Sequence, residues 1–60
     1  MKEIRVAWLF GLHEDDDGNP IDGGEWFPDT PEVRRDLRIV VEAGWEVAGT
    51  GTHWIEQRET

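Results

Sequence analysis

The stretch TPEVRRDLRIVVEAG, residues 30–44, decides the fold because it carries the longest helical pattern in the chain. Thr30 suits the N-cap of a helix, and Pro31 suits the first helical position, where its missing N–H costs nothing. Gly44 is the residue type that most often ends a helix in a left-handed conformation. We therefore predict a helix that runs from Pro31 to Ala43.

The apolar side chains of this helix share one stripe. They fall at i, i+4, i+7 and i+8 and are Val33, Leu37, Val40 and Val41. We expect a second layer of structure to cover this stripe. Three basic residues lie to one side of it, where they are placed to pair with acids of the preceding loop: Arg34, Arg35 and Arg38.

Strands are predicted on both sides of the helix. Residues 3–12 show a period-two alternation, which is typical of a strand with one buried face. That face carries Ile4, Val6, Trp8, Phe10 and Leu12. After the helix, residues 45–48 and 53–58 favour two strands joined by a tight turn at Gly49 to Gly51. These two strands would form a hairpin.

The segment between the first strand and the helix contains turn chemistry at Asp17-Gly18-Asn19. It predicts a hairpin-like excursion, followed either by a short strand near Ile21 to Phe27 or by an ordered loop pinned by Trp26 and Phe27. The predicted fold class is α+β, with the order β-(β)-α-β-β in a single acidic domain over residues 1–60. An antiparallel sheet of three to four strands would carry one helix on one face.

A single helix leaves the other face of the sheet open to solvent. Trp54 and Ile55 are adjacent in the last predicted strand, so they must point to opposite faces. We therefore expect one of them to lie on the open face. Trp54 is the candidate for a contact at that face, as part of a homodimer.

Composition excludes most enzyme classes. The chain has no serine, cysteine or tyrosine, and its one lysine is Lys2, so it lacks the usual nucleophiles and cannot form a P-loop or disulfides. Only His13 and His53 remain as nitrogen ligands, which disfavours a structural zinc site. The apolar run from Val6 to Leu12 is too short to span a bilayer. We predict a cytoplasmic non-enzyme that needs no cofactor.

The net charge of −8 comes from one stretch between the first strand and the helix. It holds eight acids and no base, while the rest of the chain is neutral; the acids are Glu14, Asp15, Asp16, Asp17, Asp22, Glu25, Asp29 and Glu32. Dense negative charge disfavours direct binding of DNA or RNA, since phosphates need a basic footprint. It favours docking on a basic nucleic-acid-binding site of a partner protein, with Trp26 and Phe27 as apolar anchors.

The same acids raise a calcium alternative. Gly18 as the sixth position of an EF-hand loop puts His13 first and Gly24 twelfth, where the loop needs an acid and a glutamate. The sequence therefore does not fit the EF-hand register, and the remaining calcium alternative is a weak site of another type. For the two histidines, we expect His53 to make a hydrogen bond in or near the turn and His13 to be a solvated loop residue. The alternative is that the two side chains bind a metal together.

In size, acidity and lack of enzymatic apparatus, the chain resembles small phage-encoded inhibitors of bacterial defence, including anti-CRISPR proteins. This resemblance implies a DNA-mimic type of inhibitor that acts in the host cytoplasm through a protein–protein interaction. It carries over no particular residue. The alternatives are a structural or regulatory module that homodimerises through the open sheet face, and a weak calcium-binding module; the chain would be a monomer or a homodimer.

Overall fold

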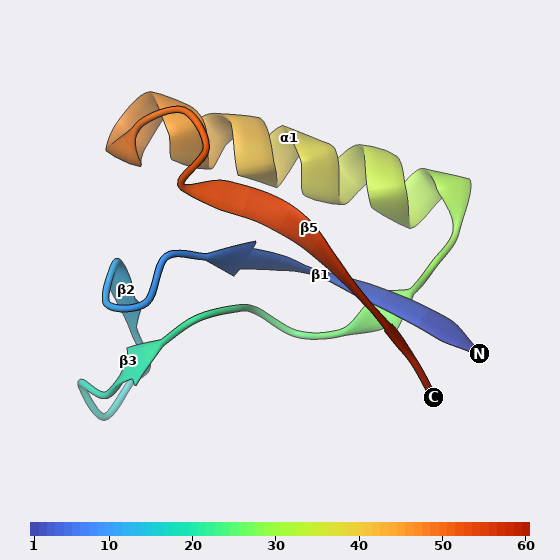
Figure 1. Cartoon of the computed structure of the whole chain (residues 1–60), viewed down its shortest axis with the longest axis horizontal. Coiled ribbons are helices and arrows are strands. Elements are labelled where there is room, and N and C mark those ends of the chain that lie inside the picture. Colours follow the sequence, from blue (N-terminus) through green and yellow to red (C-terminus); the bar gives the residue numbers. More distant parts are fainter.

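One long helix lies against a three-stranded antiparallel sheet, and a short two-stranded hairpin extends from one end of the sheet (Figure 1). The computed structural model describes all residues, 1–60. Its elements are β1 (Lys2–Trp8), β2 (His13–Glu14), β3 (Pro20–Ile21), β4 (Phe27–Pro28), α1 (Pro31–Ala48) and β5 (His53–Glu59). The α+β fold class predicted from the sequence is confirmed. α1 lacks the continuous apolar length that crossing a bilayer requires.

β1 is the central strand of the sheet, whose order is β4-β1-β5. It pairs with β5 over its whole length, from Lys2 opposite Glu59 to Trp8 opposite His53. On its other side it pairs with β4 at only two positions, of which one is Pro28. β5 is therefore a long edge strand, whereas β4 is a short edge with a proline that cannot donate a backbone hydrogen bond.

The core lies between α1 and the helix-facing side of β1. Ile4 and Val6 of β1 pack against Leu37 and Val41 of α1, because residues two apart in a strand and four apart in a helix share a face. Trp8, Val33, Trp45 and Ile55 are partly buried around this cluster. The predicted helix stripe is therefore confirmed at Leu37 and Val41, while Val40 is 51% exposed.

The first strand is shorter than the alternating pattern predicts. β1 ends at Trp8, and the predicted continuation of the buried face is wrong: Phe10 is 74% exposed and Leu12 is also exposed. Gly11 has a φ of 91°, and the Leu12 N–H donates to the Leu9 carbonyl, so the chain turns here. Alternation alone did not reveal this turn.

The helix is longer than predicted, because Gly44 does not end it. α1 continues to Ala48 and is capped by Gly49, whose φ is 113° and whose N–H donates to the Trp45 carbonyl. Gly44 lies directly against the His53 ring, where a Cβ atom would come within 2.5 Å of Nδ1. This close approach of helix and strand is the reason for a glycine here, so the predicted strand over residues 45–48 and its hairpin are wrong.

The turn at residues 49–51 is confirmed, but it joins α1 to β5. Gly49 and Gly51 both have positive φ, which only glycine adopts at little cost. Trp45, which was predicted to lie in a strand, instead extends the apolar side of α1, and its indole N–H donates to the His53 carbonyl at 2.8 Å. The element order after the hairpin is therefore β-α-β.

The segment over residues 21–27 is an irregular edge of the sheet. Gly23 bridges Ala7, and β4 begins only at Phe27, which lies opposite Ile4. Between these two bridges, two residues of β1 (5 and 6) thus face three residues of this segment (24 to 26), which is the one-residue excess of a β-bulge. The predicted short strand is present only at its two ends.

We expect Gly44→Ala to lower the free energy of unfolding, although alanine is the better helix former. Overpacking costs about 1–3 kcal/mol and the gain in helix propensity is about 1 kcal/mol, so the net loss is about 1 kcal/mol. Urea denaturation followed by tryptophan fluorescence measures this loss. In a His53→Ala background, where the space is free, the same change should stabilise by about 1 kcal/mol. Equal stabilisation in both backgrounds would contradict the steric role of Gly44.

Candidate functional site

The four consecutive acids Glu14 to Asp17 lie on the hairpin formed by β2 and β3. Asp15 N–H donates to the Asn19 carbonyl at 2.9 Å, and Gly18 N–H donates to the Asp15 carbonyl at 3.0 Å. With Gly18 at a φ of 80°, this pattern matches a three-residue hairpin loop with a glycine bulge. The turn predicted at residues 17–19 is confirmed.

The Asp15 carboxylate orders this loop from within. Its Oδ1 atom accepts the backbone N–H groups of Asp17 and Asn19, each at 2.9 Å. A side chain that bonds the backbone two residues onward is an Asx turn, which restrains the loop locally. The acids of the hairpin therefore stand on an ordered backbone.

Trp8 holds the base of the hairpin to the end of β1. Its indole N–H donates to the Ile21 carbonyl at 2.8 Å, and its backbone N–H donates to the Asp22 carbonyl at 3.0 Å. Its ring also meets His13 edge-on, with centroids 4.6 Å apart. The hairpin is thus attached through both of its strands.

The two histidines meet at the same place, and their protons can be assigned from the hydrogen bonds. His13 Nε2 lies 2.9 Å from His53 Nε2. The Thr52 hydroxyl donates to the Gly49 carbonyl at 2.6 Å, so it accepts from His53 Nδ1–H at 2.9 Å. His53 Nε2 therefore carries the lone pair, and His13 Nε2–H donates to it.

His53 is 4% exposed, and its position favours the neutral form. Burial lowers the pKa of His53 below its ordinary value, and repulsion from His13 lowers it further. The expected hydrogen bond of His53 near the turn is confirmed. His13 is exposed as predicted, but it is bonded to His53 and not only to solvent.

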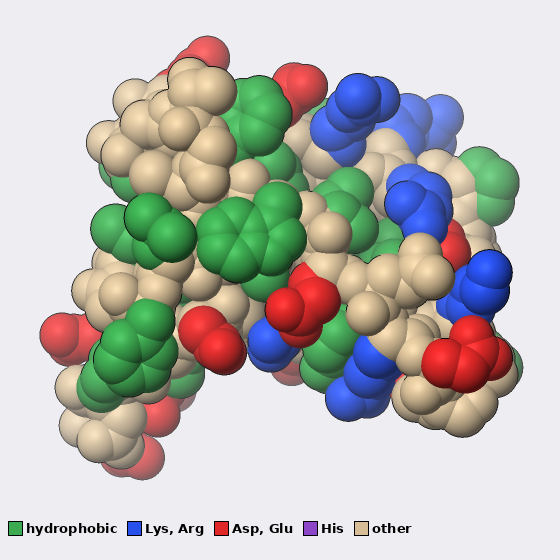
Figure 2. All heavy atoms as spheres, in the orientation of Figure 1, with side chains coloured by type: hydrophobic (Ala, Val, Ile, Leu, Met, Phe, Trp, Pro, Cys, Tyr) green, Lys and Arg blue, Asp and Glu red, His purple; other side chains and the backbone are tan.

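The acids of the predicted binding stretch divide into paired and free residues. Asp29 makes a two-pronged contact with Arg34, at 2.6 and 2.8 Å, and this hydrogen bonding lowers the pKa of Asp29. Asp22 lies 3.6 Å from Arg5. The acids of the stretch without an ion pair are Glu14, Asp15, Asp16, Asp17, Glu25 and Glu32. In Figure 2, acidic side chains gather at the lower left, around the end of the hairpin, and basic ones gather at the right, over the first half of α1.

Trp26 and Phe27 lie apart from the acidic hairpin and on opposite faces of the sheet. Trp26 is sandwiched on the open face between Arg5 and Arg58, whose guanidinium carbons lie 4.8 and 4.2 Å from its ring centre. Phe27 lies opposite Ile4 on the helix side and lines a small pocket with Val33. The two residues predicted as joint anchors therefore occupy separate surfaces.

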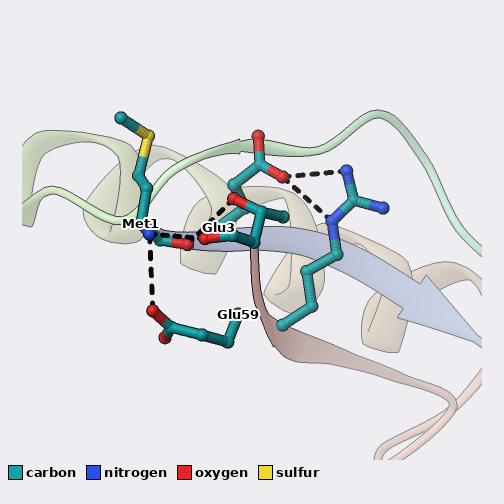
Figure 3. A network of polar contacts seen from close by, with 5 residues as sticks. Met1, Glu3 and Glu59 are labelled. Atoms are coloured by element: carbon teal, nitrogen blue, oxygen red, sulfur yellow. Dashed lines mark hydrogen bonds and ion pairs between the residues drawn. The ribbon is translucent and has the colours of Figure 1, made fainter.

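The open face of the sheet is mainly ionic. Arg58 Nε donates to Glu3 at 2.9 Å, and Arg5 Nε donates to Glu56 at 2.8 Å. At the end of the sheet, Figure 3 shows the Met1 amino group beside the Glu59 carboxylate, at 3.4 Å, while Glu59 itself points to the helix-facing side of β5. Trp54 is 40% exposed on this face, while Ile55 packs on the core, so the predicted opposition of these two residues is confirmed.

An apolar pocket of about 380 Å³ lies between the second half of α1 and the histidine pair. Its lining is Val6, Trp8, His13, Val40, Ala43, Gly44, Val47 and His53. No cluster of three or more His, Asp or Glu side chains with the arrangement of a metal site occurs in the structure.

The residues that sequence reasoning missed are the supports of the hairpin, Trp8 and the histidine pair. The signal available was His13 directly before the acids, but its partner His53 is 40 residues away.

No family model, no curated protein and no solved structure matches this chain.

We expect the protein to lose stability as the pH falls below 6.5, the ordinary pKa of histidine. The folded pKa of His53 is lowered, so the unfolded chain binds its proton first; the contribution of His53 is full above 6.5 and declines below it. Urea denaturation at about pH 7.5 and about pH 5.5, above the carboxylate range, tests this. The His53→Gln variant should show a flatter dependence. A midpoint that is unchanged or higher at the lower pH would refute the assignment.

Proposed function

We propose that the protein is a non-catalytic binding protein that uses its acidic hairpin to occupy a basic, nucleic-acid-binding site on a partner protein. One observation supports this most: four consecutive carboxylates, Glu14 to Asp17, stand on an ordered hairpin and have no ion pair. The proposed surface is hereafter called the acidic hairpin, residues 13–21.

The free carboxylates favour binding because a docking partner need not break existing ion pairs. Asp29 is paired with Arg34, and Asp22 lies 3.6 Å from Arg5, which Glu56 also contacts, so these two acids already have basic neighbours within the chain. The four hairpin acids have no ion pair within the chain, so their negative charge is available to a partner. Charge of this kind accelerates encounter with a positive surface and makes binding sensitive to salt.

Order in the hairpin lowers the entropic cost of docking. The turn is bonded internally through Asp15, and its base is tied to the body through Trp8 and His13. A preorganised segment loses less conformational entropy on binding than a disordered acidic tail does. The hairpin can therefore present its charges in one arrangement.

The chemistry of the partner follows from the charge. A groove that binds phosphates is lined with Lys and Arg, and closely spaced carboxylates can occupy it in place of the phosphates. We therefore propose obstruction of such a groove, without direct contact to nucleic acid. The most concrete form is inhibition of a bacterial defence complex in a host cell, which the resemblance to small phage-encoded inhibitors implies.

The test replaces Asp15, Asp16 and Asp17 together with Asn. Asparagine keeps a side-chain oxygen that can accept the loop hydrogen bonds, so the change removes charge and preserves the turn. We expect capture of basic nucleic-acid-binding proteins from a nuclease-treated bacterial lysate to fall by at least about tenfold, as loss of several charge-assisted contacts implies. Mass spectrometry identifies and quantifies the captured proteins.

A matched control neutralises three acids on α1: Asp36→Asn, Glu42→Gln and Glu46→Gln. It changes the net charge equally but leaves the hairpin intact, so capture should persist. Short duplex DNA should displace the captured protein from the wild type. The proposal fails if both variants lose capture equally, if the hairpin variant keeps it, or if DNA does not compete.

A further inference from the structure

β5 has an outer edge whose backbone groups are unpaired. The hydrogen bonds of Thr52 to Leu9 and of Thr60 to Met1 fix the alternation: even-numbered residues bond toward β1, and odd-numbered residues point outward. The outward groups of Ile55, Gln57 and Glu59 have no hydrogen-bond partner in the structure. The outward carbonyl of His53 is already taken by the Trp45 indole.

Other sheet edges in the chain are closed to pairing. β4 has two residues and contains Pro28, and the hairpin strands β2 and β3 are equally short. A seven-residue edge such as β5 is a template for an added strand unless its charges oppose one. The charged side chains of β5 therefore decide which strand can pair with this edge.

A second copy of β5 fits in one antiparallel register. With a two-fold axis at Gln57, Arg58 lies opposite Glu56 of the second copy, and the same pair recurs across the axis. An axis at Glu56 or at Arg58 would place like charges opposite each other, which is destabilising. An axis at Ile55 would need the His53 carbonyl, which is occupied.

The helix-facing side of the strand gives a second match of charge. In the same register, Ile55 lies opposite Glu59 of the second copy. Ile55 forms one wall of a groove whose other residues are Pro31, Arg34, Arg35 and Arg38. Arg34 is bound to Asp29 and Arg38 lies 3.9 Å from Glu42, whereas Arg35 has no ion pair. In this register Glu59 of the second copy comes beside the groove, where it can exchange its exposed 3.4 Å contact with the Met1 amino group for Arg35.

We propose that two copies of this chain pair through β5 about a two-fold axis at Gln57, which gives a continuous six-stranded sheet. The contact is the edge of the sheet, not its open face, and it does not depend on the proposed function of the acidic hairpin. The hairpin lies at the His53 end of β5, so the two hairpins would stand at opposite ends of the dimer. The pairing also shields the only long edge.

Sedimentation velocity of the full chain over the micromolar range tests the dimer. The wild type should shift from monomer to dimer with concentration. Gln57→Pro removes an outward N–H without touching the bonds to β1, so it deletes two of the bonds across the axis and should weaken the dimer by at least about tenfold. A wild type that stays monomeric, or a dimer unaffected by Gln57→Pro, overturns the proposal.

A second pair of variants guards against misfolding of the proline variant. Gln57→Lys places two like charges at the axis and keeps every backbone N–H, so it should also weaken the dimer. Thr50→Lys adds the same charge in the exposed turn and should leave the dimer intact. Circular dichroism confirms that each variant is folded. Equal behaviour of the two lysine variants would show that β5 is not the contact.

Discussion

The His53 imidazole joins the three parts of the molecule. Its ring lies against Gly44 of α1, its Nε2 atom accepts from His13 of the hairpin, and its backbone pairs with Trp8 of β1. Burial of a neutral imidazole at this point requires a partner for each ring nitrogen, and Thr52 and His13 supply them. The position of the helix end, the start of β5 and the attachment of the hairpin all follow from this arrangement.

Local signals predicted the start of the helix, and tertiary contacts decided its end. Thr30 and Pro31 act through adjacent backbone groups, so the sequence alone could place them. In the sequence, Gly44 cannot be distinguished from a glycine that ends a helix. In the structure it leaves space for the ring of His53, nine residues away, which packs against it. A pattern read along the chain cannot distinguish a glycine needed for φ from one needed for space.

The candidate site shows the same division. The turn of the acidic hairpin was predictable because Gly18 and Asn19 carry its chemistry themselves. Which acids have no ion pair could not be predicted, since Asp22 lies beside Arg5 of β1, which is 17 residues earlier in the chain. Net charge describes the whole stretch, whereas ion pairs leave only part of it available to a partner.

The small size of the core gives the edge of β5 its importance. Only five apolar residues are buried, and dense negative charge adds self-repulsion to this limited stabilisation. The chain offsets this locally, through the aromatic and histidine contacts around Trp8 and the cation–π sandwich of Trp26. None of these contacts pairs the outward backbone groups of Ile55 and Gln57. A second copy can pair them without an acid meeting an acid, because Glu56 and Arg58 alternate in sign along the strand. The same strand that completes the fold is therefore the one suited to join two chains.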